Sequence, residues 1–292
     1  MTRDIFVSTA ALAEPRELWA ILDALEAAGI DRVELGHCRV PERDRAALLG
    51  RLQRRSERFL VHNYFPPFAG DLVLNLASND PAIAGGSLAF ALEALELCAA
   101  LEAPFYSIHS GFITDPIGFD GTSFILPPPQ PGAREETAAR FVENLGTVVQ
   151  RAAALGLSVL VENSVCTEEL AGKLLLLEAE ELLELFAAIA APNLGLLLDT
   201  GHLSVTAQTE GFDALRYVDL VAPHVQAFHA HQNGGAADTH DPVGEGWVLD
   251  TLRRPELAAK PIIVEAKLRD ADAAAAHVSW LDAAASPVRS GS

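Results

Sequence analysis

Short apolar segments typical of β-strands alternate with amphipathic segments typical of helices along most of this 292-residue chain. Eight strands are predicted, and a segment with helical periodicity follows each of them. Strict alternation of eight strands with eight helices favours an α/β fold in which a parallel sheet closes into a single (β/α)8 TIM barrel. The predicted strands are Ile5–Thr9, Arg32–Leu35, Phe59–Asn63, Phe105–His109, Ser158–Glu162, Leu194–Asp199, Val225–His231 and Pro261–Glu265.

The helical segments complete this pattern. A doubly wound open sheet is the alternative architecture, but it needs no eighth unit, and no glycine-rich dinucleotide fingerprint follows the first strand. We therefore expect one barrel domain over residues 1–285 and a frayed, Ser/Gly-rich tail over residues 286–292. The predicted helices are Pro15–Ala28, Glu42–Glu57, Pro81–Leu101, Arg134–Leu155, Glu178–Ala190, Phe212–Val218, Trp247–Arg253 and Asp270–Ala284.

Several connections from a strand to the following helix are long, whereas connections from a helix to the next strand, such as 28–31 and 155–157, are short. In barrels of this type the long connections lie together at the carboxyl ends of the strands, where enzymes place their active sites. The connection at 110–133 contains Pro127–Pro129, which predicts a stiff lid. The long connections are Tyr64–Asp80, Ser110–Ala133, Asn163–Leu177 and Gln232–Gly246.

Forty acidic residues against 21 basic ones give a formal net charge of −19. Binding to nucleic acid through its phosphates requires clustered Lys and Arg, so nucleic acid is not the expected partner. The densest basic stretch, Arg51–Arg58, ends the second predicted helix and is expected on the face opposite the active site. A small-molecule substrate is the expected partner, and oligomerisation is left open.

The chain begins without a signal-peptide core, and no apolar run reaches the length that spans a bilayer. Its three cysteines, Cys38, Cys98 and Cys166, are widely spaced and form neither a disulfide framework nor a CxxC motif. We therefore expect a cytoplasmic protein without membrane association.

Ionisable residues of the kinds that bind metals follow the apolar parts of six predicted strands and recur in the loop after the seventh. A single residue of this kind at a strand end is more often a polar cap than a metal ligand. Nine of them converging on one barrel mouth indicate a common site. Clustered carboxylates repel one another at low dielectric, and divalent cations remove that cost. A mixture of imidazole and carboxylate without thiolate suits Zn, Mn, Fe or Co. The nine residues are His62, His109, Glu162, Asp199, His202, His231, Asp238, His240 and Glu265.

Residues near these nine are assigned by their spacing. His229 and His231 are two apart and share a face, and only His231 is expected to reach the metal, with His229 behind it or packed. Asp199 and His202 are expected to meet across a Thr-Gly turn. The remaining pocket-lining candidates are Asn163, Trp247 and Glu34, the last of which is equally a capped strand end.

The motifs around these residues resemble those of the xylose isomerase-like barrel superfamily, which includes sugar phosphate isomerases and epimerases and endonuclease IV. The resemblance extends from about Arg32 to Leu281. It rests on VENS at Glu162, LDTGH at 199–202, the block HAHQNGGAADTHDPVGEG and IVEA at Glu265. In the sugar epimerases one metal is held by two Glu, an Asp and a His, which implies the ligand set Glu162, Asp199, His231 and Glu265 here.

Endonuclease IV adds further ligands and holds three zinc ions, and the matching positions are His62, His109, His202, Asp238 and His240. Nine ligands exceed what one ion can use, which implies two or more divalent metal ions. The chain departs from endonuclease IV by an insertion at Tyr64–Asp71 and by His-Gln-Asn-Gly-Gly after its seventh strand, where many relatives carry an acidic residue. These departures put DNA binding in doubt more than metal binding.

The resemblance implies a metal-dependent isomerase or epimerase of a sugar or a similar hydroxy-carbonyl compound. Glu162 and Glu265 would transfer a proton through a metal-bound enediolate. The alternatives are a multi-zinc phosphodiesterase that cleaves abasic DNA or another phosphate ester, a multinuclear-iron oxidase, and a metal-binding barrel without catalytic activity.

Overall fold

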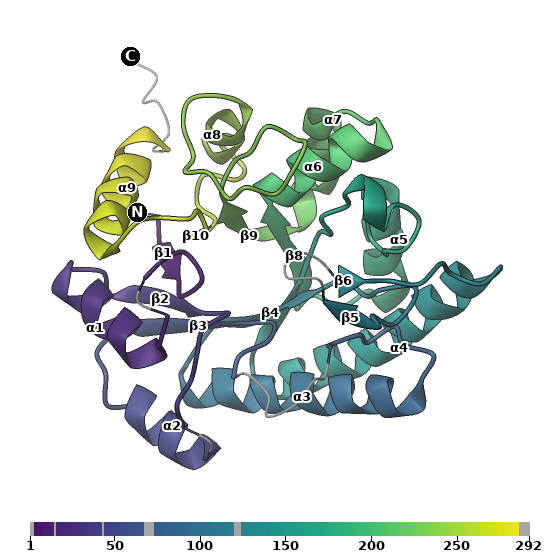
Figure 1. The fold of residues 1–292 in the computed structure, drawn as a ribbon, viewed down its shortest axis with the longest axis horizontal. Helices are drawn as coiled ribbons and strands as arrows, with labels where there is room; N and C mark the ends of the chain where they lie inside the picture. Colours follow the sequence, from purple (N-terminus) through teal and green to yellow (C-terminus); the bar gives the residue numbers. More distant parts are fainter. Residues whose placement is uncertain (1–2, 15, 43, 67–72, 120–123, 286–292) are drawn as a thin grey trace.

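The computed structural model describes residues 3–14, 16–42, 44–66, 73–119 and 124–285, and their strands close into the predicted parallel barrel (Figure 1). Around the barrel the strands follow the order β1-β10-β9-β8-β7-β4-β3-β2, and β1 pairs with both β10 and β2 to complete the ring. Each predicted strand is present within two residues of its expected bounds. The barrel strands are β1 (Ile5–Ser8), β2 (Arg32–Leu35), β3 (Arg58–His62), β4 (Phe105–His109), β7 (Ser158–Glu162), β8 (Leu194–Asp199), β9 (Val225–Ala230) and β10 (Ile262–Val264).

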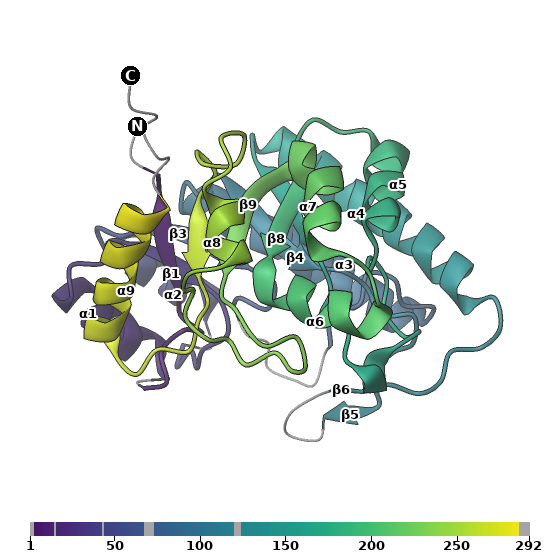
Figure 2. The same ribbon diagram turned by 90° about the horizontal axis from the view of Figure 1, so that it is seen from above.

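Helices surround the strands on the outside, as Figures 1 and 2 show from two directions. Consecutive strand and helix units lie side by side around the ring, as parallel connections require. The expected tail at 286–292 lies outside the described residues. The helices of the described part are α1 (Leu18–Ala27), α2 (Arg45–Leu52), α3 (Pro81–Ala100), α4 (Ala133–Ala154), α5 (Ala179–Ile189), α6 (Thr200–Glu210), α7 (Ala214–Val221), α8 (Trp247–Leu252) and α9 (Ala271–Ala284).

Helix α6 stands where the sequence predicts a Thr-Gly turn after β8. The Asp199 side chain caps the helix, because its Oδ1 accepts a hydrogen bond from the backbone N–H of His202 at 2.7 Å. Thr200, Gly201 and His202 are all buried, so the first turn of α6 does not have one polar and one apolar face. The sequence therefore lacks the hydrophobic periodicity from which a helix is predicted.

Two other helices differ from their predicted bounds because aspartates cap them. Asp44 accepts a hydrogen bond from the N–H of Ala46 at 3.0 Å, so α2 begins three residues later than predicted, and it ends at Leu52. Asp213 accepts one from the N–H of Leu215 at 2.8 Å and starts α7, which was predicted to begin at 212.

The long connection after β4 contains regular structure that is not predicted from the sequence. A two-stranded antiparallel sheet pairs β5 (Gly118–Phe119) with β6 (Phe124–Ile125). Phe112 of the same connection forms a bridge with Leu174 in the connection after β7. The two long connections are therefore joined above the barrel rather than extending separately.

Helix α3 is the only helix of the described residues that is long and apolar enough to cross a membrane, judged by length and composition. No such run is expected from the sequence alone. Phe90, Ala91 and Leu95 of this helix are buried, and α3 lies beside β3, β4 and α4 in the outer ring. Its apolar composition is explained by that position in the barrel wall.

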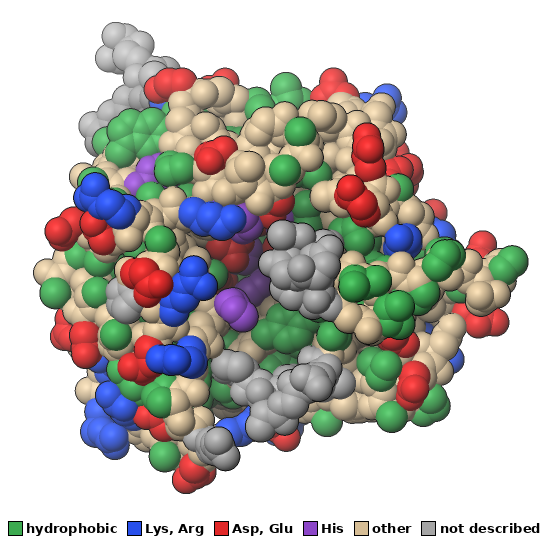
Figure 3. Space-filling view, viewed as in Figure 1, with side chains coloured by type: hydrophobic (Ala, Val, Ile, Leu, Met, Phe, Trp, Pro, Cys, Tyr) green, Lys and Arg blue, Asp and Glu red, His purple; other side chains and the backbone are tan. Residues whose placement is uncertain are grey.

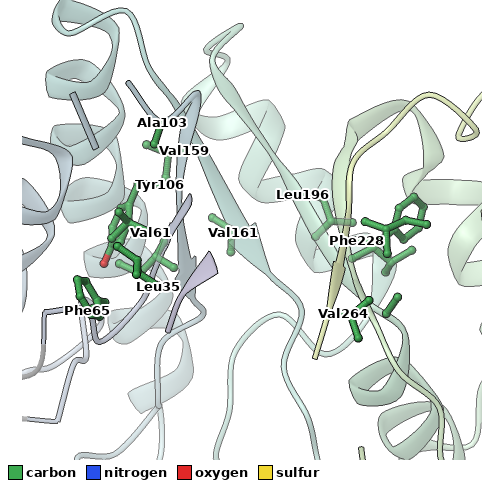
Figure 4. Close-up of a cluster of buried hydrophobic side chains, with 14 of the residues drawn as sticks. Leu35, Val61, Phe65, Ala103, Tyr106, Val159, Val161, Leu196, Phe228 and Val264 are labelled. Carbon is green, nitrogen blue, oxygen red and sulfur yellow. The ribbon is translucent and has the colours of Figure 1, made fainter. Parts of the chain in front are cut away.

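Apolar side chains occupy two regions. The larger one lies between the strands and the surrounding helices, and Figure 4 shows part of it, including Tyr106, Val161 and Phe228. The smaller one plugs the barrel interior and consists of Phe6, Leu60, Phe105, Leu160, Leu197, Ala227 and Ile263. Alternate residues of a strand face the same side, so the residues two positions after this plug also point inward, one layer nearer the carboxyl ends.

Candidate metal centre

The layer above the apolar plug contains mostly ionisable residues. Leu60, Leu160, Leu197, Ala227 and Ile263 of the plug are followed two positions later by His62, Glu162, Asp199, His229 and Glu265. Four of these five are buried, and Glu265 is partly exposed. The sequence has a polar residue at each of these inward positions, so closure of the barrel brings the five side chains together.

His62, His109 and Glu162 form one group of potential ligands. The Nε2 atoms of His62 and His109 are 3.1 Å apart, and they lie 3.6 and 3.4 Å from Glu162 Oε2. Strand register places His109 beside Glu162. The other ring nitrogen of His62, Nδ1, is 3.0 Å from Ser107 Oγ, which fixes the ring with Nε2 toward Glu162.

Asp199, His202 and His231 form a second group. His231 Nε2 is 3.0 Å from the Asp199 carboxylate, and His202 Nε2 is 3.9 Å from Asp199 Oδ2. The first turn of α6 carries His202 and directs it into the mouth. The turn also requires Gly201, because a Cβ there would lie 1.9 Å from the ring of His231.

Asp238 and His240, in the connection after β9, complete a third group with His231. His240 Nε2 is 3.0 Å from Asp238 Oδ2, and the rings of His231 and His240 stack with centroids 4.1 Å apart. His240 Nδ1 lies 3.1 Å from the carbonyl oxygen of Glu265, so the strand end holds this loop residue in place. The i, i+2 pairing expected for Asp238 and His240 is therefore present.

His229 is the residue whose position differs most from expectation. It is fully buried, yet it is not merely packed, because its Nδ1 lies 3.5 Å from Glu162 Oε1, 3.7 Å from Asp199 Oδ2 and 3.3 Å from Glu265 Oε2. Its Nε2 is 2.9 Å from Oε2 of Glu34, which is also fully buried. His229 joins Glu162 and Asp199 in a further group of potential ligands, so both histidines of the pair reach the cluster.

Glu34 therefore belongs to the cluster rather than capping a strand end. Its carboxylate orients the His229 ring, an arrangement common around metal-binding histidines. The sequence analysis did not include His229 and Glu34 among the metal-binding residues, although the sequence contains one indication for His229. The inward alternation that selects Glu162 on β7 also selects His229 on β9, one step above Ala227.

Two other pocket candidates have structural roles. Asn163 is buried and links strand ends, since its side chain donates to Asp199 O at 3.0 Å and accepts from Asp199 N at 2.8 Å. Trp247 begins α8 and packs against the apolar core. Neither residue is placed among the potential metal ligands of the described part.

The charges in the cluster compensate one another. Burial alone would raise the pKa of Glu162, but the neighbouring His229 and His109 hold it well below its usual range. Burial would likewise lower the pKa values of His202 and His229, but Asp199 raises the first, and Glu265 and Glu34 raise the second, well above the usual value. His109 differs, because desolvation at the mouth, together with the neighbouring His62, His202 and His229, lowers its pKa to about 4.

The donor set fits divalent cations. Glu162 Oε2 and the Nδ1 atoms of His229 and His231 are buried and have no hydrogen-bond partner among the described residues. Buried polar atoms without partners are costly, and each of these atoms faces other potential ligands. Imidazole and carboxylate donors without thiolate are typical ligands of Zn, Mn, Fe and Co. Bound ions would supply the missing partners.

The cluster lies in a hollow of the molecular surface. Figure 3 shows His and acidic side chains gathered at the bottom of that hollow, with Lys and Arg side chains along one side of it. The Arg51–Arg58 stretch is elsewhere, as predicted, because it leads into the amino-terminal end of β3 at Arg58. Its members are largely neutralised: Arg55 pairs with Asp23, Glu26 and Glu57.

Comparison with known proteins agrees with this geometry. The family described as the xylose isomerase-like TIM barrel matches residues 22–284. The chain belongs to this family. No curated protein sequence matches the chain significantly.

Solved structures of the same fold cover nearly the entire chain. A D-tagatose 3-epimerase-like protein has a TM-score of 0.73 at 21% identity, covering 97% of both chains. The TTHB071 protein from Thermus thermophilus, in crystals soaked with ZnCl2, has a TM-score of 0.64 at 25% identity, covering 97% of this chain and 98% of that one. D-psicose 3-epimerase from Clostridium cellulolyticum, solved with D-tagatose, has a TM-score of 0.67 at 14% identity, covering 98% and 100%.

Proposed function

We propose that this member of the xylose isomerase-like family is a metal-dependent isomerase or epimerase of a sugar or sugar-like hydroxy-carbonyl compound. The observation that carries the proposal is that two carboxylates, Glu162 and Glu265, both lie close to His229 Nδ1, at 3.5 and 3.3 Å. Inversion at a carbon atom can use two such groups at one site, one that removes the proton and one that returns a proton to the other face. Structures of sugar 3-epimerases with the same fold support this reaction class.

In this proposal the first metal would be held by Glu162, Asp199, His231 and Glu265, the set that the resemblance implies. His231 lies beside Asp199, and His229 Nδ1 is a further donor that faces Glu162, Asp199 and Glu265. A second metal would be held by His62, His109 and Glu162. When bound, such ions act as Lewis acids and stabilise negative charge that develops on a substrate oxygen.

The chain's own residues perform the remaining work. In the proposed reaction one glutamate takes the proton from the carbon next to the substrate carbonyl, and the other returns a proton to the opposite face or to the neighbouring carbon. His202 orients substrate oxygens from the first turn of α6. The low pKa of Glu162 keeps its carboxylate ionised and able to accept a proton.

A second candidate function is phosphate ester hydrolysis by a multi-metal site of the endonuclease IV kind. Three groups of potential ligands favour it, the last two of which share His231: His62–His109–Glu162, Asp199–His202–His231 and His231–Asp238–His240. A one-metal epimerase has no evident need for the first and third groups. Two or more metals can activate water and stabilise a leaving oxygen.

One experiment separates the two candidates. The metal-loaded protein is incubated in D2O with a panel of ketoses and aldoses, and NMR detects deuterium entering the carbon next to the carbonyl. A parallel reaction contains an oligonucleotide with an abasic site and a simple phosphodiester. Deuterium incorporation with formation of the isomer or epimer supports the leading proposal. Cleavage of a phosphate ester without any exchange favours the second candidate and contradicts the first.

A further inference from the structure

A second cleft lies on the same face of the barrel as the metal cluster. It has a volume of about 760 Å³ and is lined by the connections after β1, β2 and β10. Three cationic side chains from these three connections line it, Arg16, Arg39 and Lys267. In Figure 3 Lys and Arg side chains lie on the side of the hollow where β1 and β2 lie in Figure 1.

The cationic lining is unusual because the chain carries a net charge of −19. Most arginines of the described residues are paired with carboxylates, as Arg55 is with Asp23. Arg39 and Lys267 are exposed and form no ion pair with any residue that the structure describes. The cleft also contains two acidic residues, of which Glu14 pairs with Arg16 and Glu17 accepts a hydrogen bond from Trp19 N, and among the described residues neither pairs with Arg39 or Lys267.

The backbone around the two unpaired cations is held in place by hydrogen bonds to the connection after β1. Arg39 N donates to Arg16 O at 2.9 Å, and Arg39 O accepts from Leu18 N at 2.9 Å. On the other side, Leu268 N donates to Ala11 O at 2.8 Å. The backbones of Arg39 and Lys267 are thus held on either side of the connection after β1. Fixed backbone positions limit the space that the two exposed side chains sample, which reduces the entropy lost when both bind one anion.

The cleft lies next to the metal cluster along the chain and in space. Lys267 is two residues beyond Glu265, and its backbone N donates to His240 O at 2.7 Å. At the other edge, Gly36 separates the cleft from the cluster. A Cβ atom at Gly36 would lie 3.9 Å from Thr9 Oγ1, which lines the cleft, and 3.9 Å from Glu34 Oε1, which belongs to the cluster. A substrate with one end at the carboxylates could extend its other end toward the cations.

From these observations we infer that Arg39 and Lys267 bind an oxyanion at the end of the substrate remote from the reacting carbon, a phosphate or a carboxylate. The inference rests on the proposed function and narrows it to sugar phosphates or sugar acids. Arg39 supplies a planar fork that matches either oxyanion, and Lys267 adds a point charge. Arg16 contributes less, because Glu14 already pairs with it.

The test compares binding to the double variant Arg39→Gln/Lys267→Gln with binding to a charge-matched control. Arg54→Gln/Lys260→Gln also removes one arginine and one lysine, and both of these precede strands, at the opposite end of the barrel. Calorimetry of the metal-loaded proteins measures affinity for inorganic phosphate, a ketose phosphate, a sugar acid and the neutral ketose. Metal analysis verifies that all variants carry the same ions.

The expected result is that the wild type prefers one of the anionic sugars over the neutral ketose. The Arg39/Lys267 variant should lose about tenfold or more of that affinity, while the control keeps it. Loss for the ketose phosphate identifies phosphate as the anion, and loss for the sugar acid identifies carboxylate. Equal binding by wild type and variant, equal loss for the neutral ketose, or no preference of the wild type for any anion would overturn the inference. Binding needs no turnover, so these outcomes are independent of the catalytic proposal.

Discussion

The stability of the metal-free protein should fall as pH rises above about 6.5, the ordinary pKa of histidine. Three buried or half-buried histidines have pKa values raised by neighbouring carboxylates: His202 beside Asp199, His229 beside Glu265 and Glu34, and His240 hydrogen-bonded to Asp238. In each case burial alone would act in the opposite direction, and the carboxylates outweigh it. These histidines therefore hold protons in the native state that the unfolded chain releases.

The sign and size follow from linkage. A group whose native pKa exceeds its unfolded value contributes its full stability below the unfolded pKa and loses it as pH rises through the native pKa. One such histidine gives a slope of at most about 1.4 kcal/mol per pH unit, and three give at most about 4 kcal/mol. For a chain of this length, one histidine corresponds to a decrease in Tm of roughly 2 °C per pH unit and three to roughly 7 °C.

The assay is differential scanning calorimetry of protein shown by metal analysis to be metal-free, between pH 6.5 and 9. His229→Gln should flatten the slope. His277→Gln is the matched control, because burial lowers the pKa of His277 and this histidine is neutral in both states above pH 6.5. With metals bound the slope should reverse, since ligands bind metal after losing their protons. A metal-free protein whose Tm is constant or rises over this range would refute the reasoning, as would His229→Gln with an unchanged slope.

Three further predictions concern the metals and the catalytic carboxylates. Glu265→Gln should reduce turnover by at least about a hundredfold while the protein stays folded, because general acid–base groups contribute about that much, and exposed Glu256→Gln should have no effect. Full activity of Glu265→Gln would remove Glu265 from the acid–base role. Chelation should abolish activity and lower the free energy of unfolding by about 3–4 kcal/mol at metal concentrations of 100 to 1,000 times Kd, and an unchanged melting curve after verified metal removal would contradict this. Metal analysis of protein purified without chelators should give at least two ions per chain and a loss of one in His62→Ala/His109→Ala; one ion per chain in both proteins would favour a one-metal epimerase.

Much of the site could be predicted from the sequence, because in a closed barrel the position of a residue along its strand determines where its side chain lies in space. Each inward residue that follows an apolar strand segment must reach the same mouth, so His62, Glu162 and Asp199 could be assigned without knowing which strands are neighbours. The ends of the strands could also be predicted, since the alternation of strand and helix segments in the sequence fixes them within about two residues. The family match over residues 22–284 agrees with the motifs that carried the resemblance.

The features that could not be predicted from the sequence depend on contacts between distant segments. Helix α6 has no amphipathic pattern because its first turn is buried, and the capping by Asp199 decides its start. The position of His229 depends on Glu34, which is 195 residues away in the chain. Likewise Arg39 and Lys267 are isolated charges in the sequence and share a cleft only after the barrel closes.

The charge of the cluster connects the histidine protons to the number of metals. Glu34, Glu162, Asp199, Asp238 and Glu265 together carry five negative charges when ionised, and three protonated histidines would leave two uncompensated. If the histidines are neutral and bind metal, two divalent ions leave one negative charge and three leave one positive charge. An enclosed site tolerates only a small net charge, because desolvation penalises each uncompensated ion. One ion alone would leave three negative charges or require histidines to stay protonated and unable to bind it. The same carboxylates that hold protons on the histidines of the empty cluster thus favour two or three divalent ions in the loaded one. The three-ion state would suit the anionic substrate that the neighbouring cations select.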